Sequence, residues 1–138
     1  DTVCMRAFQS AVGCVNAERG NLLWSRTIGG TEGVAGNEQV IVGADASDRL
    51  TAWRTASGEV AWTSERLMYR SVSSPLAVGP TVVFVDGEGT VHWMSLDKGE
   101  PVLRLSTDSS GAAAAPVASG NTLLVVTRNG GLHAFRPE

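Results

Sequence analysis

The sequence predicts an all-β fold, a partial β-propeller of short, four-stranded antiparallel blades. A strand–turn–strand unit recurs at residues 12–24, 50–62 and 91–103, and a shortened copy begins at residue 132. The turn glycines of the three longer copies, Gly20, Gly58 and Gly99, are 38 and 41 residues apart, a period typical of propeller blades. Continuous apolar runs such as 82–85 indicate strands covered on both faces, as in stacked blades.

Each repeat is expected to supply up to four strands joined by tight turns. We divide the single domain, residues 1–138, into repeats at about 1–30, 31–71, 72–111 and 112–138. The expected strands are 2–8, 11–17 and 21–27; 33–36, 39–45, 49–54 and 59–63; 73–78, 81–86, 90–96 and 101–106; and 114–118, 122–127 and 131–136. The dipeptides Glu88-Gly89 and Asn129-Gly130 share one slot and predict two-residue hairpin turns.

The first and last repeats are shorter than the two between them. The first lacks an innermost strand and the last an outermost strand. We therefore expect the C-terminal arc, about three to four blades, of a larger ring. An open arc exposes blade faces and strand edges, which predicts that the chain self-associates.

Large side chains that end the outermost strands are candidates for docking one blade on the next. Trp24 and Trp62 occupy this slot in their repeats, and Leu103 is the weaker equivalent in the third. Pro101 begins an outermost strand, where a missing N–H is tolerated.

The two cysteines, Cys4 and Cys14, invite a disulfide, but the repeat argues against one. A two-residue turn at positions 9 and 10 places Cys4 opposite Val15 and Cys14 opposite Met5, so that the sulfurs lie on different faces. We expect two buried thiols, unless a bulge shifts the register.

Composition and motifs exclude several functions. The chain is 43% hydrophobic and 18% charged, with a net charge of −3 and no basic stripe, which disfavours nucleic acid, and no apolar run is long enough to span a membrane. His92 and His133 share a slot but lack nearby ligands for a metal. No nucleophile, dinucleotide or P-loop motif is present. Most acidic residues fall in predicted turns, where they favour turn geometry. These residues are Glu18, Asp45, Asp48, Asp86, Glu88 and Asp97. We therefore expect no catalytic residue among them.

The connection between the second and third repeats is the candidate partner-contact loop. Three large side chains are flanked by arginines there, a composition typical of contact surfaces. The alternative is that Leu67 or Met68 tucks between blades. The loop comprises Glu65, Arg66, Leu67, Met68, Tyr69 and Arg70.

The segments Ala17-x-x-Gly-x-x-x-Trp24 and Thr55-x-x-Gly-x-x-x-Trp62 resemble the quinoprotein-type propeller repeat. Within that superfamily the chain looks like a member of the BamB family of outer-membrane assembly lipoproteins. Four segments carry this resemblance: 62–75, Glu88-Gly-Thr-Val-His-Trp93, Asp108-Ser-Ser-Gly111 and Asn129-Gly-Gly-Leu-His-Ala-Phe135.

The resemblance implies the end of an eight-bladed ring and a non-enzymatic periplasmic scaffold of the outer-membrane β-barrel assembly (BAM) complex. The implied partners are the periplasmic domains of BamA and unfolded outer-membrane proteins, and no cofactor is implied. Family members are tethered to the outer membrane by a lipidated N-terminal cysteine. Residues 1–3 before Cys4 are not a lipobox, so we expect that anchor, and most BamA-contacting loops of the family, to lie upstream.

Two other functions remain open. One is an unrelated propeller-type binding protein. The other is a fragment of a quinoprotein (PQQ-dependent) dehydrogenase, whose repeat is similar but which needs a full ring, a calcium site and, typically, adjacent cysteines. Here the cysteines are ten residues apart and no acid cluster suits calcium.

Overall fold

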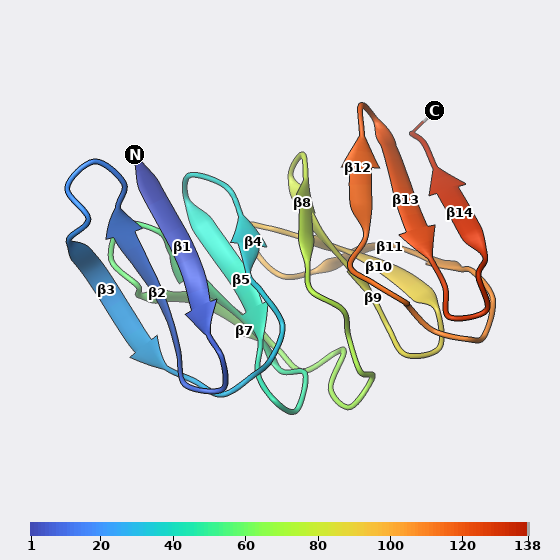
Figure 1. Ribbon diagram of the computed structural model, residues 1–138, viewed down its shortest axis with the longest axis horizontal. Coiled ribbons are helices and arrows are strands. Elements are labelled where there is room, and N and C mark those ends of the chain that lie inside the picture. Colours follow the sequence, from blue (N-terminus) through green and yellow to red (C-terminus); the bar gives the residue numbers. More distant parts are fainter. Residues whose placement is uncertain (138) are drawn as a thin grey trace.

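The computed structural model describes residues 1–137, which form fourteen strands in four separate antiparallel sheets. No helix occurs among these residues. The sheets follow one another along the chain and fan out side by side (Figure 1). The predicted fold class, an all-β partial propeller, is confirmed.

We call the sheets blades 1 to 4. Blade 1 contains β1 (Thr2–Ala7), β2 (Ala11–Asn16) and β3 (Leu22–Thr27). Blade 2 contains β4 (Ala35–Gly36), β5 (Val40–Ala44), β6 (Leu50–Arg54) and β7 (Val60–Ser64). Blade 3 contains β8 (Leu76–Val78), β9 (Thr81–Val85), β10 (Thr90–Ser95) and β11 (Pro101–Ser106). Blade 4 contains β12 (Val117–Ser119), β13 (Thr122–Val126) and β14 (Leu132–Phe135).

Within each blade the strands pair in chain order, as an antiparallel meander. Blades 2 and 3 have four strands each, whereas blades 1 and 4 have three. Among residues 1–137, blade 1 lacks the first strand of the four-stranded pattern, which is β4 in blade 2. Blade 4 lacks the last strand, which is β11 in blade 3.

The core consists of three apolar clusters, one between each pair of neighbouring blades. Val42 and Phe84 belong to the cluster between blades 2 and 3. Their strand neighbours face the other way: Ile41 packs toward blade 1, and Val83 and Val85 pack toward blade 4. Successive strand residues point to opposite faces, so a strand with a core on both sides must be apolar throughout. This explains the continuous apolar runs.

The outer faces of the two end blades are open. Large side chains there are between 43% and 72% exposed. They are Val3 and Met5 in β1, Phe8 in the loop that follows β1, and Val117, Val126 and Leu132 in blade 4.

Two tryptophans cross from one blade to the next. The Trp24 indole N–H donates to the Thr55 carbonyl at 2.7 Å, and its ring lies against Gly58, where an added Cβ would be 2.5 Å away. Trp62 repeats this arrangement one blade later: its N–H donates to the Leu96 carbonyl at 2.8 Å, and its ring covers Gly99.

Leu103 stands in the corresponding place on β11. Its residue is 47% exposed, and it lines an apolar hollow beside Trp93 and Phe135. Of the three predicted docking residues, Trp24 and Trp62 each make a hydrogen bond to the next blade. The third, Leu103, is about half exposed.

The prediction that the cysteines are free thiols is wrong, because Cys4 and Cys14 form a disulfide. The loop between β1 and β2 has three residues, with Gln9 in the left-handed region at φ 54°. The extra residue shifts the register by one, so that Cys4 lies directly opposite Cys14. Both sulfurs then lie on the same face.

The two-residue turn assumed at Glu88-Gly89 is also wrong. Four residues, Asp86 to Gly89, join β9 to β10, and the Gly89 N–H donates to the Asp86 carbonyl at 3.0 Å. Gly89 has a φ of 82°, while Glu88 does not have positive φ. A single left-handed glycine after a turn is a common longer hairpin loop.

Candidate functional site

The candidate contact loop, residues 65–70, connects β7 to β8 and divides into inward and outward side chains. Leu67 is only 3% exposed and packs in the core between blades 2 and 3. Tyr69 is 79% exposed, and Glu65, Arg66 and Arg70 also face solvent, while Met68 is half-buried. Leu67 therefore has to be removed from the predicted contact surface, because it holds the loop to the core.

The backbone of this loop is tightly specified. Tyr69 and Ser71 both adopt left-handed φ values, 63° and 55°, which are uncommon for residues other than glycine. The Tyr69 N–H donates to the Ser47 carbonyl at 3.0 Å, and the Arg70 N–H donates to the Leu67 carbonyl at 3.2 Å. Such conformations persist only where the surroundings impose them, so Tyr69 is presented by a rigid support.

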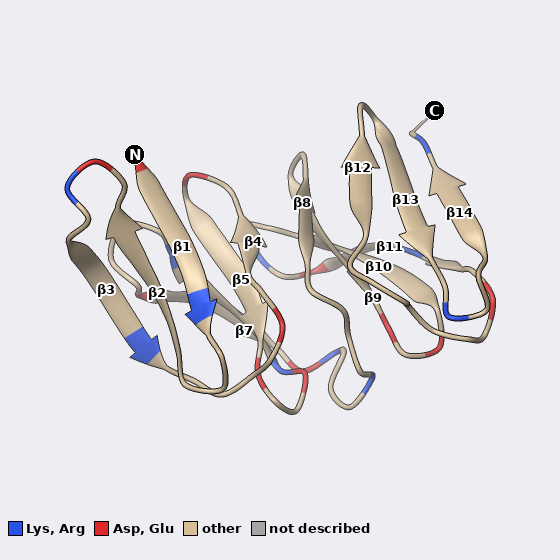
Figure 2. Cartoon of the chain, viewed as in Figure 1, with Lys and Arg blue, Asp and Glu red and all other residues tan. Residues whose placement is uncertain are grey.

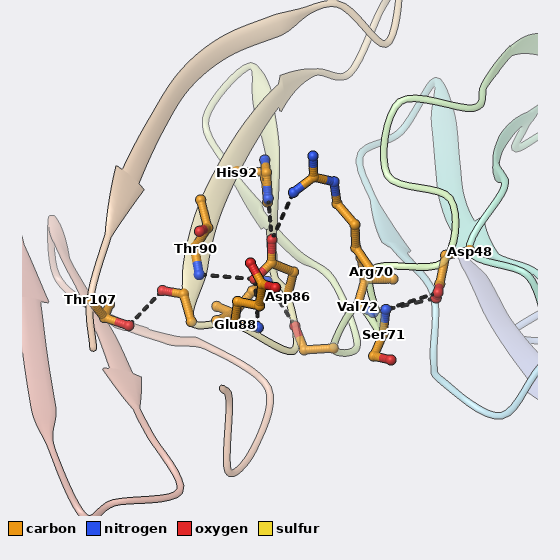
Figure 3. A network of polar contacts seen from close by, with 12 residues as sticks. Asp48, Arg70, Ser71, Val72, Asp86, Glu88, Thr90, His92 and Thr107 are labelled. Carbon is orange, nitrogen blue, oxygen red and sulfur yellow. Dashed lines mark hydrogen bonds and ion pairs between the residues drawn. The ribbon is translucent and has the colours of Figure 1, made fainter. Parts of the chain in front are cut away.

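Asp48, in the turn between β5 and β6, anchors the end of the loop from blade 2. Its carboxylate accepts hydrogen bonds from the Ser71 N–H at 3.0 Å and the Val72 N–H at 3.3 Å (Figure 3). Close by, Arg49 pairs with Glu65 at 2.5 Å on the surface.

Asp86 anchors the loop from blade 3. The Nε2–H of His92 donates to Oδ2 of Asp86 at 2.9 Å, and Nη1 of Arg70 lies 3.6 Å from the same oxygen. The N–H groups of Glu88 and Thr90 donate to Oδ1. Figure 3 shows the Arg70 and His92 side chains converging on this carboxylate from different segments.

The electrostatics of Asp86 favour its charged form. Burial alone would raise the pKa of this carboxyl, whose side chain is 2% exposed. The hydrogen bonds from His92 and from the Thr90 and Glu88 amides outweigh burial, and the pKa is lowered below its ordinary value. Asp86 is thus a buried anion that fixes Arg70 and His92.

A crevice of about 450 Å³ opens beside the loop, between the loop and strands β10 and β11 of blade 3. Its basic lining is supplied by Arg66 and Arg70 from the loop and Arg104 from β11. Apolar side chains make up much of the remaining wall: Leu67, Met94 and Val102. The loop was predicted from its own composition, whereas Arg104, 34 residues after Arg70 in the sequence, could be added only from the fold.

A related polar cluster lies between blades 3 and 4, at residues 108–111. Asp108 accepts hydrogen bonds from the Ser110 hydroxyl at 2.5 Å and the Thr127 hydroxyl at 2.7 Å, and His133 lies 3.6 Å away. These hydroxyls and the Ser110 amide lower the pKa of Asp108 to about 2. The two histidines of the shared slot therefore each lie beside an aspartate.

Charge is otherwise dispersed over the molecule, with most acidic residues in turns (Figure 2). Within residues 1–137, no group of three or more His, Cys, Asp and Glu side chains could hold a metal ion. The same part of the chain contains no helix long and apolar enough to cross a membrane.

Comparison with known proteins relates these features to a family. A family model described as outer membrane protein assembly factor BamB matches residues 1–64. The outer membrane protein assembly factor BamB of Burkholderia pseudomallei is 41% identical over 135 residues. That alignment covers 98% of this chain but 35% of the relative, so the chain spans about a third of the length of this relative.

Solved structures agree on the fold. The crystal structure of BamB from Moraxella catarrhalis superimposes with a TM-score of 0.89 at 16% identity, covering 98% of this chain and 40% of that one. A quinohemoprotein alcohol dehydrogenase from Comamonas testosteroni has a TM-score of 0.74 at 15% identity, covering 91% of this chain and 27% of that one. At these identities the likeness shows the fold alone. The resemblance expected from the sequence is confirmed: this chain is related in sequence and fold to a segment, about one third in length, of the outer-membrane assembly factors of the BamB family.

Proposed function

We propose that this chain acts as a non-enzymatic periplasmic scaffold in the outer-membrane β-barrel assembly (BAM) complex, where it assists the folding and insertion of outer-membrane proteins. The observation that carries the proposal is the 41% identity, over 98% of the chain, to a protein named as an outer membrane protein assembly factor. The dehydrogenase resembles the chain only in fold, at 15% identity.

The disulfide supports a periplasmic location. Disulfides form and persist in oxidising compartments such as the bacterial periplasm and are rare in the cytosol. Cys4 and Cys14 lie opposite each other in neighbouring strands, so the fold itself brings them together.

The proposed partners are the periplasmic domains of BamA, and the proposed contact surface is the outward part of the loop. Tyrosine and arginine are enriched at interfaces, where a rigid aromatic ring costs little entropy on binding. Tyr69 is exposed on a backbone held by both neighbouring blades, with Arg66 and Arg70 beside it. Leu67 contributes by anchoring this surface.

An affinity-capture experiment tests the proposal. The protein, folded with its disulfide intact, is immobilised and offered the purified periplasmic domains of BamA; we expect their retention. In parallel, the protein is titrated with pyrroloquinoline quinone and calcium, and no binding is expected. Failure to retain the BamA domains would refute the proposed partner, and saturable quinone binding with calcium would contradict the non-enzymatic role.

A further inference from the structure

The crevice between the loop and blade 3 concentrates positive charge on a chain whose net charge is −3. Arg66 and Arg104 line it from opposite sides, one on the loop and one on β11, and Arg70 lies with them. Its lining comes from the loop and from β10 and β11 of blade 3.

Two of these arginines have unused binding capacity. Within residues 1–137, no acidic side chain pairs with the guanidinium of Arg66 or of Arg104. Both residues are exposed, and each guanidinium presents a planar fork that matches a carboxylate. Arg70 is different, because Asp86 holds its side chain at 3.6 Å and thereby fixes its place in the crevice.

Apart from His92, the rest of the lining is apolar. Met94 and Leu67 are almost fully buried, at 1% and 3% exposed, and form the floor, while Val102 is 60% exposed along the rim. A free inorganic anion would use the arginines but leave this apolar surface exposed to water. A peptide with alternating acidic and apolar side chains complements both.

We propose that this crevice binds an acidic, partly apolar peptide segment of a protein partner, with Arg66 and Arg104 receiving its carboxylates. The inference deepens the proposed scaffold function and rests on it for the nature of the partner. Because the arginines are exposed, binding weakens as salt screens their charge, while the apolar contacts remain.

Binding of a synthetic probe tests this inference. The probe is a fluorescent eight-residue peptide in which Asp and Leu alternate, compared by anisotropy with the same peptide carrying Asn for Asp. The folded protein is expected to bind the Asp peptide about tenfold more tightly, as bidentate arginine–carboxylate pairing requires. Equal affinity for the two peptides, or binding to neither, would overturn the proposal.

Matched variants locate the binding. Arg66→Gln combined with Arg104→Gln is expected to weaken Asp-peptide binding about tenfold, whereas Arg19→Gln with Arg128→Gln, which removes two exposed arginines elsewhere, leaves it unchanged. Arg66→Lys with Arg104→Lys keeps the charge and is expected to retain part of the affinity. Circular dichroism and Tm verify folding. If the two double Gln variants bound the Asp peptide with equal affinity, the peptide would bind at another surface and the proposal would be overturned.

Two further measurements separate the possible failures. Vesicles of anionic phospholipid that bind the protein through Arg66 and Arg104, with no binding of the Asp peptide, would replace the peptide by a lipid surface and overturn the inference. Capture of the BamA periplasmic domains is measured with the same variants. Normal capture of the BamA domains without binding of the Asp peptide would refute only the peptide-binding role of the crevice. Binding of the Asp peptide without capture of the BamA domains would refute only BamA as the partner.

Discussion

Asp86 is the residue on which the candidate site depends most. Its buried carboxylate holds His92 and Arg70 and closes the turn between β9 and β10 through two backbone N–H groups. Hydrogen bonds to a charged group contribute more to stability than neutral ones. Asp86 therefore links the local turn, the loop and the crevice.

Replacing Asp86 by Asn is expected to lower the free energy of unfolding by about 1.5–3 kcal/mol at neutral pH, the contribution typical of hydrogen bonds to a charged group. The folded-state pKa of Asp86 is below its ordinary value, so its stabilisation is present above about pH 4 and is lost as pH falls through the folded pKa. Urea denaturation of Asp86→Asn and wild type from pH 7 downward measures this difference. Asp97→Asn, at an exposed turn acid, is the control; equal effects of the two substitutions would contradict the anchoring role.

The cysteines show how a one-residue uncertainty changes a prediction at this scale. Repeat alignment locates the turn near residue 9 but cannot distinguish two loop residues from three. A slip of one residue moves every side chain of a strand to the other face. Gln9, at φ 54°, is the extra residue, and glutamine carries no strong signal for a left-handed conformation.

At the scale of elements, the repeated contact between blades is a tryptophan lying on a glycine. The three turn glycines Gly20, Gly58 and Gly99 have nearly the same φ, 72°, 73° and 70°. Only Gly58 and Gly99 are covered by a tryptophan of the preceding blade; nothing lies within 4 Å of a Cβ added at Gly20. The same turn position therefore exists in one blade without a tryptophan contact and in two blades with one.

Gly58→Ala is therefore expected to destabilise the protein by about 1–3 kcal/mol more than Gly20→Ala, the range typical of overpacking. Both substitutions carry the same left-handed backbone strain, so the difference isolates the collision with Trp24. Chemical denaturation of the two variants provides the measurement. Equal losses of stability would show that Trp24 does not dock blade 1 on blade 2.

Most strands could be predicted because the repeat supplies the same information several times. Apolar runs such as Val82–Val85 and the glycine turns mark each strand independently. The loop at residues 65–70 lies outside the aligned strand–turn–strand units at 50–62 and 91–103, so its composition could not reveal that Leu67 points inward. The sequence predicts that its anchors, Asp48 and Asp86, lie in turns. Their contacts with the loop join residues that are distant in the sequence, so only the structure reveals them.

At the scale of the whole molecule, the two end blades expose apolar side chains that the inner blades bury. Met5 in β1 and Phe8 in the loop that follows β1 are 51% and 72% exposed, and Leu132 in blade 4 is 67% exposed. Apolar surface of this kind favours association. We propose that a second copy of the chain covers it.

Light scattering at high protein concentration is expected to show a dimer or larger oligomer. Met5→Lys combined with Phe8→Ser is expected to shift the distribution toward the monomer, because both changes remove apolar contact area. A wild-type chain that stays monomeric at high concentration would contradict this prediction.

The proposed role of the whole molecule is tested most directly by calorimetric titration of the folded, disulfide-bonded protein with the periplasmic domains of BamA. The scaffold role predicts saturable binding that is weakened by Tyr69→Ala, because this exposed ring is held rigidly on the contact loop, and unchanged by the distant Arg19→Gln. Absence of binding by a protein shown to be folded would contradict the proposed function.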